Sequence, residues 1–147
     1  MNNNEISVLG TKAYLTADKT FPAGFEITKF PADSDGIDIQ ENQIGNGEMG
    51  VNGDMITWHT PVPQQLTITV VPKSEEDKNL QILLDRNRAA KGRSNIQDNI
   101  TLVVTLADGT THTFSNGIII SGELGYSITS QGKIRTKRYG FMFEQFI

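Results

Sequence analysis

The fold is decided by residues 66–77, Leu66-Thr67-Ile68-Thr69-Val70-Val71-Pro72-Lys73-Ser74-Glu75-Glu76-Asp77, where a strand pattern passes directly into a helix start. The first six residues are apolar or β-branched and alternate with a period of two, which is typical of a strand. Ser74 is a favoured helix N-cap, and Asp77 occupies the position of a capping-box partner, although Glu or Gln is usual there. The stretch predicts a strand followed at once by a helix.

The helix is expected to cover about residues 75–91. Its first turn is acidic and its last turn is basic, which suits the helix dipole at both ends. Gly92 fits the position after the C-cap, where a left-handed conformation is common. Three leucines form a narrow apolar stripe at helical spacing: Leu80, Leu83 and Leu84. We therefore expect the helix to lie on a sheet and to bury one side only.

Strand-like segments lie on both sides of this stretch. They cover residues 12–15, 25–30, 37–40, 55–60, 100–106, 111–120, 122–129 and 133–146. Asp108-Gly109 is a hairpin signal. Ile118-Ile119-Ile120 is apolar on both faces of its strand, so we expect it to be the most buried part. One helix among short strands predicts a mainly β fold, an antiparallel β-sandwich or partial barrel with one flanking helix and unpaired sheet edges.

Residues 44–54 interrupt the strand pattern, because four glycines in eleven residues make the backbone permissive. The segment is expected to be a flexible loop or the tip of a hairpin. A purely solvated loop would not need the apolar side chains of Met49 and Val51. We therefore expect the segment to become ordered against a neighbouring molecule, with a mobile tip of no function as the alternative.

A projecting basic hairpin is expected around residues 126–138, with its turn at Ser130-Gln131-Gly132. Tyr139, Phe141 and Phe143 share one face of the last strand, and three basic residues extend that face in front of them: Lys133, Arg135 and Lys137. A face that changes from aromatic to basic is expected to pass beyond the domain body. Its cations could bind nucleic acid, but the acidic chain favours a solvated or subunit-facing strip.

Length and composition predict a single domain over residues 1–147, without disulfides because the chain has no cysteine. The polar N-terminus lacks the features of a signal peptide, and no apolar run approaches the ~20 residues that span a bilayer. Residues 1–60 carry nine acidic and three basic side chains, whereas residues 61–147 carry eight acidic and ten basic ones. Opposite ends of this kind suit a head-to-tail assembly, unless the charges mix on the folded surface.

No pattern in the sequence indicates catalysis, a metal site or a cofactor. Asp33, Asp35 and Asp38 resemble the start of a calcium loop, but the glycine comes too early and position twelve is Ile44 instead of glutamate. The two histidines lack the spacing of zinc ligands, and neither a nucleophile elbow nor a phosphate-binding loop occurs. Trp58, the single tryptophan, is expected in the core or at an interface.

The order of elements over residues 55–146 resembles the tail tube proteins of long-tailed bacteriophages, particularly the small ones of contractile tails. The resemblance rests on Pro72-Lys73-Ser74-Glu75-Glu76-Asp77-Lys78, the leucine-bearing helix, Asp108-Gly109, Asn116-Gly117 and Tyr139-Gly140-Phe141-Met142-Phe143. It implies that six subunits form a ring, that their sheets join into one β-barrel, and that rings stack into the tube that delivers the genome.

The resemblance also implies a location and partners. The protein would belong to the virion tail, be assembled in the host cytoplasm, and bind mainly copies of itself. Sheath, tape-measure and baseplate or terminator proteins would be further partners. DNA would pass through the lumen without specific binding, and no membrane would be involved.

Two alternatives come from other classes. A ring-forming tube protein of a type VI secretion system or a phage-like bacteriocin would share the fold but not the genome cargo. A small β-sandwich carbohydrate-binding module would use Trp58 and the glycine-rich loop. In the leading interpretation, the residues expected at subunit or ring interfaces are Gly47, Glu48, Met49, Val51, Asn52, Lys133, Arg135, Lys137 and Arg138.

Overall fold

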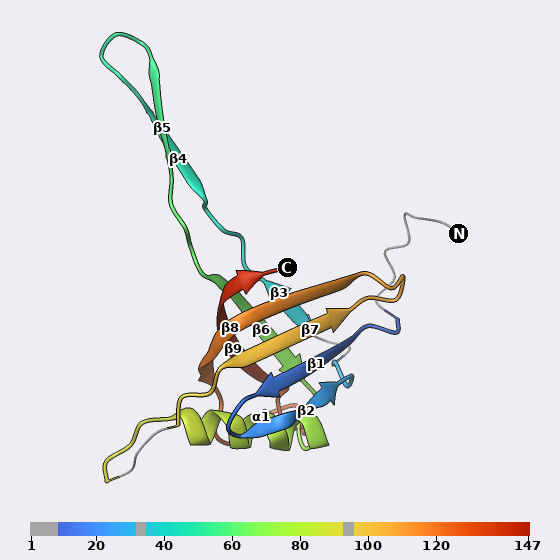
Figure 1. The fold of residues 1–147 in the computed structure, drawn as a ribbon. Coiled ribbons are helices and arrows are strands. Elements are labelled where there is room, and N and C mark those ends of the chain that lie inside the picture. Colours follow the sequence, from blue (N-terminus) through green and yellow to red (C-terminus); the bar gives the residue numbers. More distant parts are fainter. Residues whose placement is uncertain (1–8, 32–34, 93–95) are drawn as a thin grey trace.

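A computed structural model of the chain describes residues 9–31, 35–92 and 96–147. Seven strands form one antiparallel sheet in the order β2-β1-β7-β8-β9-β6-β3, and β4 and β5 form a separate hairpin (Figure 1). The strands are β1 (Lys12–Ala17), β2 (Phe21–Ile27), β3 (Ile37–Ile39), β4 (Gly45–Met49), β5 (Met55–His59), β6 (Gln64–Val70), β7 (Ile100–Thr105), β8 (Thr111–Gly122) and β9 (Lys137–Phe146). One helix, α1 (Glu75–Asn87), follows β6 directly. The expected mainly β fold with one flanking helix is confirmed.

The large sheet curls into a partial barrel (Figure 1). The backbone N–H of Val71, at the end of β6, donates to the carbonyl of Lys29, just after β2, at 3.1 Å. Because β2 and β6 lie near opposite edges of the sheet, this hydrogen bond shows that the two sides approach each other at one end.

The core fills the inner face of the curled sheet. Along β7 every second side chain is buried, and β1, β6 and β9 follow the same alternation. The fully or almost fully buried apolar side chains from the strands are Ala13, Leu15, Ala17, Ile27, Leu66, Ile68, Val70, Ile100, Leu102, Val104, Phe114, Tyr139, Phe141 and Phe143. Burial of each large side chain stabilises the fold by about 1.5–3 kcal/mol.

Helix α1 completes the core with its leucine stripe, since Leu80 and Leu83 are fully buried and Leu84 packs against them. Ser74 is the N-cap, and its Oγ accepts a hydrogen bond from the Asp77 backbone N–H at 3.2 Å. The Asp77 carboxylate accepts from the Lys73 N–H at 2.9 Å, one residue before the place that a capping box would use. The expected start of the helix is therefore confirmed.

The helix ends at Asn87, four residues before the expected end, and Gly92 is not its C-terminal cap. At this end the Asn87 side-chain amide donates to the Leu83 carbonyl and to the Asp98 carboxylate, both at 2.8 Å, which ties the last turn to the segment before β7. Arg88 then turns to an extended conformation, with ψ of 129°. Only Arg86 among the predicted basic residues lies in the last turn.

A buried ionic cluster connects α1 to β9. Asp77 and Lys137 are both fully buried, with the Lys137 Nζ 3.7 Å from the Asp77 Oδ1. The Lys137 Nζ also donates to the Gln81 Oε1 at 3.0 Å, and the Tyr139 hydroxyl donates to the Asp77 Oδ1 at 2.8 Å. Burial, together with the nearby Asp77 carboxylate, raises the pKa of Tyr139 far above its ordinary value, so this hydroxyl stays a donor.

A second buried carboxylate, Asp98, connects three separate segments. It accepts hydrogen bonds from the backbone N–H groups of Lys19 and Thr20 at 2.9 and 3.0 Å, and from the Asn87 side chain at 2.8 Å. The Thr20 hydroxyl donates to it as well. Burial alone would raise the pKa of Asp98, but these donors together lower the pKa below its ordinary value of 3.8.

Two expectations about the strands are wrong. Strand β2 covers Phe21–Ile27 instead of the expected residues 25–30, so Pro22 lies inside a strand; a proline is tolerated there because an edge strand forms hydrogen bonds to a neighbour on one side only. Ile118 and Ile120 are 37% and 44% exposed instead of being the most buried part, because they point to the outer face of the sheet. Asp33 and Ser34, parts of an expected turn and of the rejected calcium pattern, lie outside the described residues.

Replacement of Lys137 by methionine should destabilise the fold by about 3–5 kcal/mol, because it leaves the Asp77 carboxylate buried without its cation. Chemical denaturation measures the change. Lys78→Met, at an exposed position on α1, is the matched control and should change the stability by less than about 0.5 kcal/mol. Equal effects of the two substitutions would contradict the structural role of the pair.

Asp98→Asn should cost about 1–3 kcal/mol at pH 7, because an amide cannot accept all the N–H and O–H groups that face this position. A carboxyl whose pKa is lowered on folding stabilises the native state above its unfolded pKa and loses this effect as the pH falls through the folded pKa. The difference in unfolding free energy between the two proteins should therefore shrink below about pH 4. Urea titrations at pH 7, 4 and 3 test this, and a pH-independent difference would contradict it.

Candidate assembly interface

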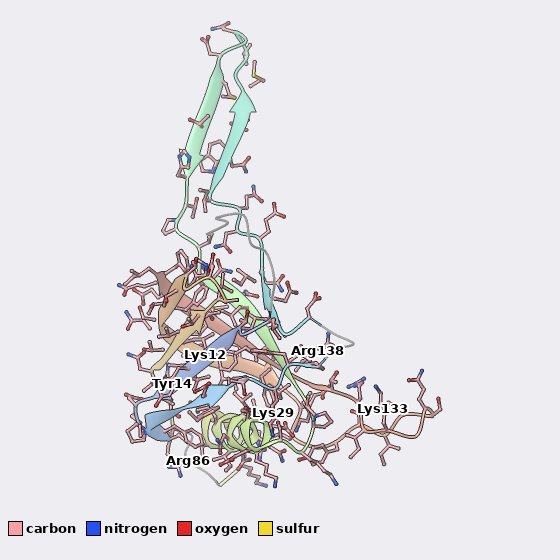
Figure 2. The ribbon with its side chains drawn as sticks, turned by 90° about the vertical axis from the view of Figure 1, so that its right-hand side faces the viewer. Lys12, Tyr14, Lys29, Arg86, Lys133 and Arg138 are labelled. Atoms are coloured by element: carbon pink, nitrogen blue, oxygen red, sulfur yellow. The ribbon has the colours of Figure 1, made fainter. Side chains whose placement is uncertain are left out.

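The hairpin of β4 and β5 projects away from the body at the end opposite α1 (Figures 1 and 2). Its register pairs Gly45 with His59 and Met49 with Met55, and the turn at residues 50–54 closes with the Gly50 N–H donating to the Asp54 carbonyl at 2.7 Å. Of the two forms expected for residues 44–54, the structure has the hairpin, with residues 45–49 in a strand.

The projecting hairpin has no core of its own. Several of its large apolar side chains are exposed on both faces, and Val51 at the tip has no cover at all, with a relative exposure of 105%. The others are Ile44, Met49, Met55, Ile56 and Trp58. A two-stranded hairpin without packing is only marginally stable in water, so this surface favours a partner. Trp58 thus lies outside the core.

A second projection, the arm of residues 123–136, connects β8 to β9 and carries Lys133 away from the body (Figure 2). It is held together by a single bridge between Ile128 and Ile134 and by the Arg135 N–H, which donates to the Ser127 carbonyl at 3.0 Å. The strand expected at 122–129 is wrong, and the strand expected at 133–146 is present but begins only at Lys137.

The base of the arm is fixed to the buried ionic cluster. The Tyr126 ring lies 4.8 Å from the Lys137 Nζ, and the Gln81 side-chain amide donates to the Leu124 carbonyl at 2.9 Å. Arg135 forms an ion pair with Glu123 across the base. A cation held against an aromatic face and desolvated on its other side contributes about 2 kcal/mol.

The expected interface residues fall into three places. Gly47, Glu48, Met49, Val51 and Asn52 are on the hairpin and exposed. Lys133 and Arg135 are on the arm, and Arg138, the second residue of β9, is exposed on the outer face of the sheet. Lys137 is instead fully buried beneath the arm, because the alternation of β9 places it on the same inner face as Tyr139.

Sequence patterns did not point to the hollow that the structure forms beside the arm. It has a volume of about 650 Å³ and lies between the outer faces of β3 and β6 and residues 129–138. Thr67, Thr69 and Thr129 are among its lining residues, together with charged ones. The alternating threonines of β6 were a signal that the outer face of this strand is polar.

Both edges of the large sheet are open in the described chain, since β2 pairs only with β1 and β3 only with β6. The outward N–H and C=O groups of these strands thus lack a partner strand. The described residues contain no group of three or more metal-ligating side chains. In the same part of the chain, no helix is long and apolar enough to cross a membrane.

Solved structures share this fold. A chain of the six-fold symmetrised cryo-EM structure of the anti-feeding prophage baseplate has a TM-score of 0.57 at 14% identity, covering 100% of this chain and 96% of that one. A chain of the PVC sheath-tube complex of an extracellular contractile injection system in the extended state gives 0.51 at 17% identity, with 98% and 92% covered. The anti-feeding prophage tube-terminating cap gives 0.54 at 13%, with 100% and 93% covered.

Among curated proteins, none matches the sequence. A protein-family model, described as tail fiber protein gp32, matches residues 4–147. The match covers nearly the whole chain, including both projections, the helix and all seven strands of the large sheet. The chain therefore belongs to the tail fiber protein gp32 family, with a tail-tube-like fold shared with components of contractile injection systems.

Proposed function

We propose that this protein is a structural component of a phage-type tail, in which hexameric rings stack into a tube that conducts the genome. The observation that carries the proposal is the partial barrel with two open sheet edges on a fold shared with sheath-tube, cap and baseplate structures. The six-fold symmetry of the baseplate structure supports a ring of six.

Lateral assembly would complete the sheet. When β2 of one copy meets β3 of the next, the unpaired backbone groups of both edges gain partners, and closure of the ring removes every edge. The ring would thus gain the stability that one curled sheet lacks. Sheath, tape-measure and baseplate or terminator proteins are the further partners, and DNA crosses the lumen without specific binding.

Axial assembly would use the two projections. Fixing the backbone of an ordered residue costs about 1–2 kcal/mol, so the bare hairpin gains its full order only on contact with another ring. This cost keeps subunits apart until a first ring offers a surface, and the virion tail is then built in the host cytoplasm from soluble copies.

The second candidate is a tube or cap of an injection particle that carries no genome. It is favoured by the similarity to the extracellular contractile injection system and the anti-feeding prophage. Electron microscopy of purified particles separates the candidates, because only a genome-delivering tail is attached to a DNA-filled capsid.

Deletion of residues 48–53 should leave a folded subunit that cannot elongate, because these residues form the end of the hairpin and contribute nothing to the core. Circular dichroism and thermal unfolding should match the unaltered protein, whereas negative-stain micrographs should show rings or single subunits only. Lys78→Met, on α1 at the opposite end of the molecule, is the control and should still give tubes. Tubes of normal length from the deletion would refute the axial role of the hairpin.

A further inference from the structure

The projecting hairpin carries acidic charge only. Residues 30–72 contain no Lys or Arg but six acidic residues, and the hairpin takes two of these, Glu48 and Asp54, to its end. Both side chains are exposed. Figure 2 shows the labelled cations Lys12, Lys29, Arg86, Lys133 and Arg138 on the body and the arm, away from the hairpin. The cations thus lie on the body and the arm, where acidic residues lie as well, and the hairpin end has no cation of its own.

The hollow beside the arm collects cations. Three of its lining residues are basic, Lys133, Arg135 and Arg138, against two acidic ones, Asp35 and Asp38. Arg135 already pairs with Glu123. Arg138 has no ion-pair partner within the described ranges, although its backbone is held in the ladder between β9 and β6. An exposed guanidinium on a fixed backbone and without a salt-bridge partner is suited to a carboxylate from another molecule.

The hairpin end has a shape that suits this hollow. From Gly45 to Met49 strand β4 advances about 13 Å at ~3.3 Å per residue, and the turn of residues 50–54 extends the hairpin further beyond the body. The turn contains Gly50 and Gly53, which have no side chain to cover the backbone, and threonines are among the residues that line the hollow. Val51 can meet Ile128 on the arm, which is 91% exposed.

We propose that the hairpin end of one copy docks in the cationic hollow of the next copy, with Glu48 and Asp54 facing Arg138 and Arg135. This inference rests on the proposed stacking and names its receiving surface. The occupant is a second copy of this chain. Its hairpin supplies negative charge that complements the arginines of the hollow, and it projects far enough from the body to reach another molecule.

A nucleic-acid strand is the competing occupant of a cationic hollow. Asp35 and Asp38 in the same wall oppose a polyanion, which would meet them along its whole backbone. A hairpin end brings only two carboxylates, which can be placed beside the arginines and away from these aspartates. The geometry therefore favours the protein partner.

Charge reversal and its rescue test the docking. Glu48→Lys with Asp54→Lys should raise the concentration needed for tube formation at least tenfold, and Arg138→Glu should do the same, while Arg135 keeps its ion pair with Glu123. The chain that carries all three substitutions should recover tubes, because the contact with residue 138 is restored with opposite sign. Lys12→Glu, outside the hollow, is the control and should assemble like the unaltered protein. If either charge-reversed chain assembled as before, or if the combined chain failed to recover tubes, the docking site would be overturned. The proposed tube would not be contradicted by that result.

Cysteine cross-linking tests the same contact without requiring tubes. The natural chain has no cysteine. When a tagged Asn52→Cys chain is mixed with an untagged Thr67→Cys chain, the mixed disulfide joins the hairpin end to the hollow. The tag distinguishes this mixed dimer from dimers of two identical variants. We expect a mixed dimer, reduced several-fold by 0.5 M salt because the contact is ionic. Thr101→Cys on the outer face of β7 is the control and should give none. Absence of the Thr67 cross-link would overturn the inference, and capture of a DNA oligonucleotide by the hollow instead would identify the competing occupant.

Discussion

A seven-stranded sheet with a single helix can bury only one of its faces, and this limitation governs the molecule. Helix α1 and the curl of the sheet close the inner face over aromatic and aliphatic side chains. In the part of the chain that the structure describes, the outward sides of the edge strands β2 and β3 have no partner strand, and isoleucines of β8 are exposed on the outer face. Unpaired edge groups and exposed apolar residues such as Ile120 favour contact with a partner chain, which would supply hydrogen bonds to the edges and cover the apolar surface.

The buried pair of Asp77 and Lys137 links this fold to assembly. On its inner side the pair fixes α1 to β9 through Gln81 and Tyr139. On its outer side Lys137 lies against Tyr126, which fixes the base of the arm and so one wall of the cationic hollow. A buried ion pair adds little net stability, but it specifies one arrangement of the groups around it. The position of a proposed docking surface thus depends on a residue that no partner touches.

Local patterns predicted what local interactions decide. The cap at Ser74, the leucine stripe of α1 and the aromatic face of β9 follow from periodicity and propensity, and all are present. The end of α1 depends on Asn87 and its partner Asp98, eleven residues away, so no helix signal contained it. Lys137 looked like part of a basic surface strip because the sequence does not show that the strand brings it against Asp77 of α1, sixty residues earlier in the chain. The isoleucines of β8 looked buried because apolarity alone does not show which face of a strand points to the core, and Ile118 and Ile120 are on the outer face.

The central claim is that identical chains complete the open edges of the sheet, and hydrogen exchange of the edge amides tests it most directly. Outward-facing amides of β2 and β3 should exchange rapidly in dilute protein and slowly in concentrated protein, at the concentration where sedimentation shows rings or tubes. A particle that remains single at every concentration, with these amides already slow to exchange, would contradict the claim.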